Sequence, residues 1–133
     1  MMDYYYGRES EQYSALVIPK LLLSDAAFEG LSLDAKLLYG VLLDRMSLVS
    51  RNGWYDEENR AYIVYHLSDI QKDYGFSRKK ILSHLVELER FGLIERKKRG
   101  RGLPNIFYVK NFFLVEDEAY DPSRSVQIDT FGI

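Results

Sequence analysis

Basic side chains are concentrated in one stretch of the sequence, residues 77–101. This stretch has nine Lys and Arg residues and three acidic residues, a net charge of +6, although the whole chain has a net charge of −2. The remaining residues therefore carry −8. A phosphate backbone responds to the local field and not to the total charge, so this segregation favours a nucleic-acid-binding surface.

The first group of basic residues is the run Arg78-Lys79-Lys80, which follows Ser77. Such side chains hydrogen-bond phosphates and base edges, and a helix fits the major groove of B-DNA. Cations at the start of a helix are unfavourable for the helix itself, because its N-terminus already has a positive partial charge. Their presence here indicates an anionic partner, although a solvated charged face is the alternative.

The second group lies in a glycine-containing loop at 97–102. Arg101 stands between two glycines and is the candidate for insertion into a minor groove. The other basic residues of the loop are expected to contact phosphates, which set affinity and salt dependence but not sequence preference. The residues expected to contact DNA are Ser77, Arg78, Lys79, Lys80, Ser83, His84, Lys97, Lys98, Arg99, Arg101 and Asn105.

A helix over 77–91 is predicted to position the first group. Its buried stripe is Ile81, Leu85 and Leu88, which repeat at i, i+4 and i+7, and this places Arg78 to Lys80, Ser83, His84 and Glu87 on the solvent side. Ser77 is expected to cap its start, with Phe76 and Ile81 at the spacing of a hydrophobic staple. Gly92 and Leu93 predict a Schellman stop.

The neighbouring segments predict a winged helix-turn-helix. A short helix over 68–74, with Ser68 and Gln71 as a capping box, is followed by Gly75 and then by the basic helix. Strands at 93–96 and 106–109 would flank the basic loop, which is then the wing.

The upstream half is predicted to supply helical and hairpin elements. Helical turns are expected over 21–28, and a mostly buried helix over 33–48 with Ser32 as its cap. Gly40 within that helix suggests a close contact with another helix. Residues 54–55 and 61–65 indicate a hairpin. The fold class is therefore α+β: a winged helix-turn-helix with a helical N-terminal part, a hairpin and a two-stranded basic wing.

Three regions are expected: an N-terminal arm at 1–14, a DNA-binding domain at 15–115, and an acidic linker or tail at 116–133. The Tyr4-Tyr5-Tyr6 run in the arm is a candidate dimer surface, because Tyr is enriched at interfaces. The alternative is a partly ordered terminus.

Several function classes are disfavoured. There are no cysteines, which excludes thiolate catalysis, disulfides and Cys-ligated zinc. No apolar run is long enough to cross a membrane, and no signal peptide is evident, so a cytoplasmic location is expected. No phosphate-loop, nucleophile-elbow or metal-ligand spacing is present, and we expect no enzyme activity, metal or cofactor.

Three segments carry a resemblance to a known family: VIPKLLLSD, LSLDAKLLYGVLLDRMSLVSRNGWYDEENRAYIVY and FSRKKILSHLVELERFGLIERKKRGRGLPNIFYVKNF. Over roughly 17–112 the chain resembles the N-terminal domain of the RepA_N replication initiators of plasmids from Gram-positive bacteria. The middle segment is the most specific. Val49 and Arg60 depart from the family pattern, outside the basic helix and wing.

The resemblance implies a winged-helix domain that binds repeated or palindromic duplex sites in a plasmid origin. It also implies a homodimer, and a separate C-terminal domain that engages host replication proteins and is expected to lie outside this chain. A transcriptional repressor of the same fold is the main alternative. A winged helix that binds only protein is another, and the +6 segment argues against it.

Overall fold

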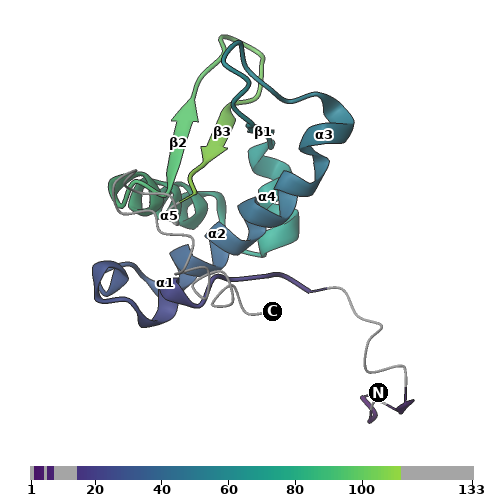
Figure 1. Ribbon diagram of the computed structural model, residues 1–133, viewed down its shortest axis with the longest axis vertical. Coiled ribbons are helices and arrows are strands. Elements are labelled where there is room, and N and C mark those ends of the chain that lie inside the picture. The colour runs from purple at the N-terminus through teal and green to yellow at the C-terminus, as the bar shows by residue number, and fades with distance from the viewer. Residues whose placement is uncertain (1, 5, 8–14, 112–133) are drawn as a thin grey trace, which may run out of the picture.

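The computed structural model describes residues 2–4, 6–7 and 15–111 (Figure 1). The helical elements are α1 (Leu21–Ser24), the 3₁₀ turn η2 (Ala26–Phe28), α2 (Leu33–Arg45), the 3₁₀ turn η3 (Met46–Leu48), α3 (Val49–Asn52), α4 (Leu67–Tyr74) and α5 (Arg78–Arg90). The strands are β1 (Ile63–Val64), β2 (Ile94–Lys97) and β3 (Ile106–Val109).

The three strands form an antiparallel sheet in the order β1-β3-β2. Phe107 of β3 is the central residue, paired with Ile63 on one side and Arg96 on the other. In Figure 1 the sheet and the loop that joins β2 to β3 lie at one end of the molecule, and α1 lies at the other. Helices with a small antiparallel sheet in this arrangement confirm the predicted winged helix-turn-helix.

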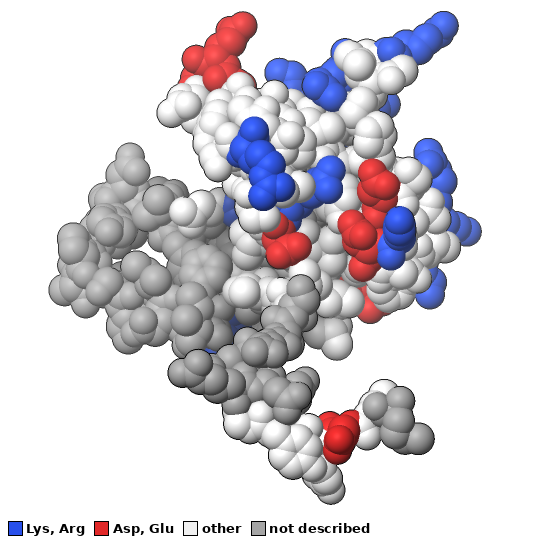
Figure 2. Space-filling view, turned by 90° about the vertical axis from the view of Figure 1, so that its right-hand side faces the viewer, with Lys and Arg blue, Asp and Glu red and all other residues white. Residues whose placement is uncertain are grey.

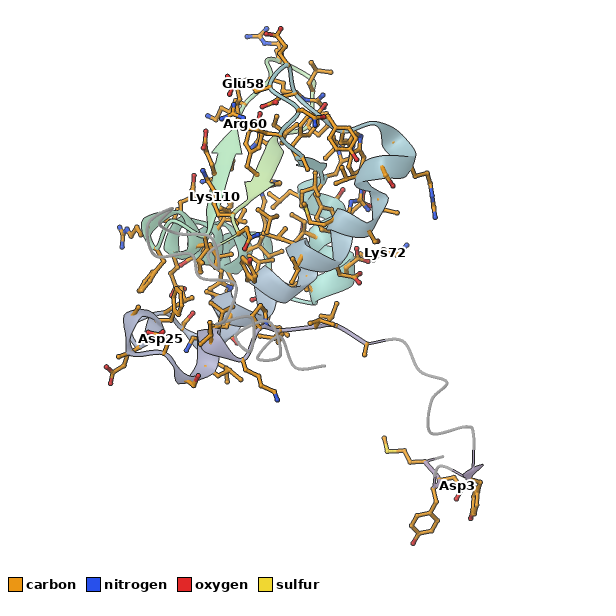
Figure 3. The ribbon with its side chains drawn as sticks, in the orientation of Figure 1. Asp3, Asp25, Glu58, Arg60, Lys72 and Lys110 are labelled. Carbon is orange, nitrogen blue, oxygen red and sulfur yellow. The ribbon has the colours of Figure 1, made fainter. Side chains whose placement is uncertain are left out.

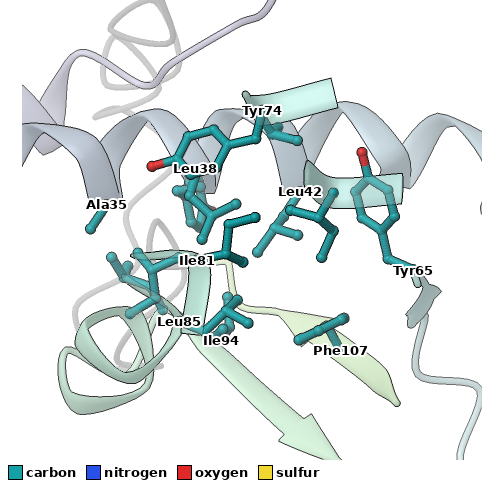
Figure 4. Packing of buried hydrophobic residues seen from close by; sticks show 14 of the residues in the cluster. Ala35, Leu38, Leu42, Tyr65, Tyr74, Ile81, Leu85, Ile94 and Phe107 are labelled. Atoms are coloured by element: carbon teal, nitrogen blue, oxygen red, sulfur yellow. The ribbon is translucent and has the colours of Figure 1, made fainter. Parts of the chain in front are cut away.

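The core lies between α2, α5 and the sheet. Figure 4 shows α2 side chains facing those of α5, with sheet residues closing the remaining side. The labelled members are Ala35, Leu38, Leu42, Tyr65, Tyr74, Ile81, Leu85, Ile94 and Phe107, all buried. This explains why α2 is apolar around most of its circumference: it is the central helix, as its pattern predicts.

The predicted cap of α2 is confirmed, and its end differs from the prediction. The Ser32 hydroxyl accepts a hydrogen bond from the Ala35 N–H at 3.1 Å. The α-helix ends at Arg45 and continues as η3 and α3, which stop at Gly53 with a left-handed φ of 65°. Near its middle, the buried Tyr39 donates its O–H to the Lys110 carbonyl and so ties α2 to the end of β3.

Gly40 is explained by a close approach, although not by a second helix. A Cβ placed there would lie 2.9 Å from Cγ1 of Ile18 and 3.4 Å from the Val17 carbonyl oxygen. The extended segment that precedes α1 therefore crosses α2 at this glycine. Glycine allows two backbones to approach in this way at a cost of about 1 kcal/mol in helix propensity.

The predicted hairpin is much shorter than expected. Tyr55 and Ala61 form a single bridge, and β1 pairs with β3 instead of extending the hairpin. The reason is the tight turn at Asp56, whose carboxylate accepts the Arg60 Nε–H at 2.7 Å and the Tyr108 hydroxyl at 2.9 Å. The turn is thereby attached to β3, and Figure 3 shows Arg60 beside the sheet.

The predicted start of α4 is wrong. The helix begins at Leu67, with His66 in an extended conformation as the cap and no side-chain capping bond, so Ser68 and Gln71 do not form a capping box. Leu67 packs against the core, and this contact draws it into the first turn. Tertiary packing has overridden a local capping preference.

Parts of the predicted arm and tail lie outside the described residues. Of the tyrosine run, Tyr4 and Tyr6 are described; both are exposed and their rings meet edge to face. The acidic region 116–133 lies wholly outside. Among the helices described, none is long and apolar enough to cross a membrane.

Candidate nucleic-acid interface

The helix-turn-helix is built from α4, a three-residue turn and α5. Gly75 ends α4 with a left-handed φ of 88°, and its N–H donates to the Gln71 carbonyl at 2.8 Å. Ser77 then caps α5, since its hydroxyl accepts the Lys80 N–H at 3.3 Å. The short turn determines the angle at which α5 leaves α4.

The far end of α5 confirms the predicted Schellman stop. The Leu93 N–H donates to the Leu88 carbonyl at 2.9 Å, and the Gly92 N–H donates to the Glu89 carbonyl at 3.0 Å. Gly92 has the left-handed φ of 72° that this motif requires. The stop turns the chain directly into β2 and places the wing beside the helix.

The outward face of α5 is defined here as the exposed side opposite Ile81, Leu85 and Leu88. It carries Lys79, Ser83, Val86 and Arg90, which recur at intervals of three or four residues. Arg78 and Leu82 are also exposed and flank this face on the side of the wing, where both line a cleft with wing residues. Lys80 lies on the other flank, with its Nζ 5.4 Å from the centre of the Phe76 ring.

His84 is not on the outward face, and this prediction is wrong. The residue is 8% exposed, and its Nδ1 lies 3.1 Å from the Tyr74 hydroxyl oxygen. The Phe76 ring meets the imidazole edge to face, and Nε2 is 3.9 Å from the Asp34 carboxylate. His84 therefore joins α5 to α4 and α2 and has no free edge for a base.

Tyr74 completes this buried group. Its O–H donates to the Asp34 carbonyl, and with that proton committed, Nδ1–H of His84 is the donor to the Tyr74 oxygen. Burial raises the pKa of Tyr74, and the nearby Asp34 and Glu87 carboxylates raise it further. The phenol consequently remains protonated and keeps its donor role.

Glu87 was also expected to face solvent, and it is instead a cap for α2. Its two carboxylate oxygens accept the Ser32 N–H at 3.0 Å and the Ser32 hydroxyl at 2.8 Å. A carboxylate at a helix N-terminus is favoured by the helix dipole. The contact joins the middle of the basic helix to the start of the central helix.

The other two acids of the basic stretch are paired as well. Glu89 accepts the Arg96 Nη2–H at 2.8 Å, which ties α5 to β2, and Glu95 lies 3.2 Å from the Lys110 Nζ. Figure 3 shows Lys110 beside the sheet. Within the described residues, by contrast, no ion pair or hydrogen bond engages the side chains of Arg78, Lys79, Lys97, Lys98 and Arg101.

The wing loop, residues 98–105, joins β2 to β3. β2 runs Ile94–Lys97, one residue later than predicted, and β3 matches its predicted bounds. Arg99 is exposed but folds back, and its Nε–H donates to the Pro104 carbonyl at 3.1 Å. Gly100 and Gly102 have positive φ angles of 120° and 81°, which leave Arg101 exposed between them at the tip.

A cleft of about 240 Å³ separates α5 from the base of the wing. Arg78 and Leu82 line one wall, and Leu103 and Asn105 line the other. Asn105 is half-buried and lines this cleft together with the α5 residues. Figure 2 shows basic side chains at the top right, along the right-hand edge and near the centre of this view, with acidic side chains between them and projecting at the upper left.

The structure therefore brings together most of the sequence-predicted residues and changes the set on α5. Ser77, Arg78, Lys79, Lys80 and Ser83 are exposed on the helix. Leu82, Val86 and Arg90 are also exposed, and sequence reasoning missed them. Leu82, Val86 and Arg90 follow Lys79 by three, seven and eleven residues, and this helical spacing is the sequence signal that places them near Lys79. No group of three metal-ligating side chains occurs among the described residues.

Comparison with known proteins gives the family. The model of the family described as "Replication initiator protein A (RepA) N-terminus" matches residues 14–122, most of the chain. The chain belongs to the RepA_N family. Because the match spans the whole described fold from α1 to β3, the helix-turn-helix and the wing strands are elements of a RepA_N domain.

Three solved structures resemble this RepA_N domain, each 26% identical in sequence. A Rep–DNA complex matches with a TM-score of 0.70 over 90% of this chain and 99% of the other. An N-terminal domain of a DNA-binding protein matches with 0.69 over 92% and 100%. An MDR initiator matches with 0.68 over 96% of each chain.

A curated relative, the "41 kDa protein" of Lactobacillus helveticus, is 26% identical over 106 residues. The match covers 79% of this chain and 30% of the relative. The RepA_N domain therefore corresponds to about a third of the length of that protein.

Proposed function

We propose that this chain is the DNA-binding domain of a plasmid replication initiator and that it reads repeated sites in the plasmid origin. The observation that carries the proposal is that Lys79 on the outward face of α5 and Arg78 on its flank have no side-chain partner among the described residues, while all three acids of the basic stretch do. Support comes from membership of the replication-initiator family and from the resemblance to a Rep protein in complex with DNA.

The two basic groups have different roles in this proposal. The outward face of α5 enters the major groove, where Lys79 and Ser83 hydrogen-bond base edges. Lys97, Lys98 and Arg101 hold the adjacent backbone, with Arg101 reaching the minor groove. The salt bridge between Glu89 and Arg96 ties α5 to β2 and so helps to hold the two basic groups in a fixed relative position.

The proposal extends to the assembly. The domain acts by binding and not by catalysis, without a metal or cofactor. It works as a homodimer on repeated or palindromic sites, since two-fold symmetry in a site matches two-fold symmetry in the protein. Host replication proteins are engaged by another region of the initiator.

The direct test is a fluorescence-anisotropy titration of the chain with duplexes that carry the repeats of its own plasmid origin. At about 150 mM salt the origin duplex is expected to bind about a thousandfold or more tightly than a scrambled duplex of the same composition. Equal affinity for the two duplexes would refute origin recognition.

Single variants distinguish contacts to bases from contacts to phosphates. Lys79→Ala is expected to reduce the free energy of binding to the origin duplex by about 1–3 kcal/mol. It should also reduce the ratio of the affinities for the origin and scrambled duplexes. Lys72→Ala, an exposed lysine on α4 outside both basic groups, is the matched control and should leave both affinities unchanged. A Lys79→Ala variant that weakens both duplexes equally would show that this lysine contacts phosphate only.

A further inference from the structure

Two apolar side chains are exposed on α5, close to its unpaired cations. Leu82 is 37% exposed and Val86 is 38% exposed. They are four residues apart, so they adjoin on the helix surface and form one apolar strip. Lys79, Ser83 and Arg90 surround the strip, and no other described part of the fold covers it.

The position of the strip relates it to the wing. Leu82 lines the cleft between α5 and the wing loop, with Arg78 on its own side and Asn105 opposite. A duplex held by the cations on both sides of this cleft would present base edges, and not phosphates, to the strip. An aliphatic side chain gains nothing from a phosphate, whereas the major groove displays one methyl group, the 5-methyl of thymine.

We propose that Leu82 and Val86 are specificity-determining residues that contact thymine 5-methyl groups in the major groove. The inference rests on the proposed function and adds an apolar component to a readout that the basic residues make by hydrogen bonds. It predicts that the preferred site contains thymines beneath the middle of α5, at positions where hydrogen-bond donors alone would not select them.

Charge complementarity selects DNA over a second copy of the chain as the occupant of this strip. Arg78, Lys79 and Arg90 would face the same cations of a second copy, and like charges in contact are costly. The phosphates of a duplex neutralise the same three side chains.

The test uses the wild-type chain and a duplex selected by it from a randomised library. Each thymine of the selected site is replaced singly by deoxyuridine, which lacks only the 5-methyl group, and Kd is measured by anisotropy. Loss of one contacted methyl is expected to weaken wild-type binding about fourfold. Leu82→Ala and Val86→Ala should each lose this sensitivity at one thymine. Leu23→Ala, an exposed leucine on α1, should retain all of it.

The outcomes are distinguishable. Deoxyuridine effects that are absent, or that are equal in the wild type and both variants, overturn the inference while leaving DNA binding intact. A selected site without thymine beneath α5 also overturns it. Failure to select any duplex refutes the proposed function itself. If the variants alter the sedimentation of the free chain and leave the deoxyuridine effects unchanged, the strip contacts another copy and the inference is wrong.

Discussion

At the scale of single residues, the basic helix shows how packing decides which side chains remain available. His84 and Ser83 are adjacent in sequence, and both were candidates for base contact. The His84 side chain is buried against Tyr74 and Phe76, and the Ser83 side chain is exposed. The difference arises because α2 and α4 both pack against the side of α5 that carries His84.

The variants His84→Ala and Ser83→Ala should therefore differ. His84→Ala removes a buried ring and its hydrogen bond, and should lower the free energy of unfolding by about 1–3 kcal/mol without changing the selected DNA sequence. Ser83→Ala should leave stability within about 0.5 kcal/mol and change sequence preference. Urea denaturation and in vitro selection would measure both. A changed sequence preference in His84→Ala would contradict the structural role.

At the scale of elements, a few polar contacts hold α5 and the hairpin in place. Glu87 joins α5 to the N-terminus of α2, and Glu89 joins α5 to β2. Asp56 joins the short hairpin to β3 through Tyr108, and its contact with Arg60 closes the turn of the hairpin. The contacts of Glu87 with Ser32 and of Asp56 with Tyr108 connect segments far apart in the sequence, so no local pattern predicts them.

The capping contact between Glu87 and Ser32 can be tested by a double-mutant cycle. Ser32→Ala should cost about 1 kcal/mol of stability, because it removes the cap of α2. Glu87→Ala should also destabilise, and the double variant should lose less than the sum, with a coupling of at least about 0.5 kcal/mol. Strictly additive losses in urea denaturation would show that the two residues act independently.

The hairpin contact predicts a particular dependence of stability on pH. Hydrogen bonds from the Arg60 backbone, the Arg60 side chain and Tyr108 hold the pKa of Asp56 below its ordinary value of 3.8. A lowered folded-state pKa contributes stability that is fully present above the ordinary value and is lost as the pH falls through the folded-state value. The difference in stability between wild type and Asp56→Asn should therefore be constant above about pH 5 and shrink below about pH 4.

Thermal melts between about pH 2 and pH 7, in steps of about half a pH unit, would measure this difference. Glu57→Gln provides the control, since Glu57 is an exposed acid in the same turn. The expected profile for that variant is parallel to the wild type. A difference between wild type and Asp56→Asn that stays constant down to the lowest pH would contradict the assignment.

At the scale of the whole molecule, opposite charges are segregated, and the fold reinforces the segregation. The stretch 77–101 carries +6 in a chain of −2. Its three acidic side chains are paired within the protein, so its cations dominate the electrostatic field around α5 and the wing. Such a field raises association rates with polyanions and makes them sensitive to salt.

Salt dependence therefore measures the number of phosphate contacts. Lys97→Ala and Lys98→Ala are each expected to weaken binding to origin and scrambled duplexes alike, and to reduce the slope of log K against log salt by about one unit. Lys110→Ala is a useful control, because its ammonium is paired with Glu95. Slopes that do not change in the two wing variants would place these lysines away from the DNA backbone.

The sequence by itself determined the helix-turn-helix, the wing strands and the basic character of both, because apolar periodicity, glycine stops and charge runs are local signals. Gly75, Ser77 and Gly92 act through residues only three or four positions away, so their roles can be predicted from the local sequence. The tertiary structure alone decided which α5 residues at the boundary between its buried and exposed sides are accessible to solvent. Burial of His84, the capping role of Glu87 and the exposure of Leu82 all depend on how α2, α4 and the wing pack around the helix, and no local pattern encodes those contacts.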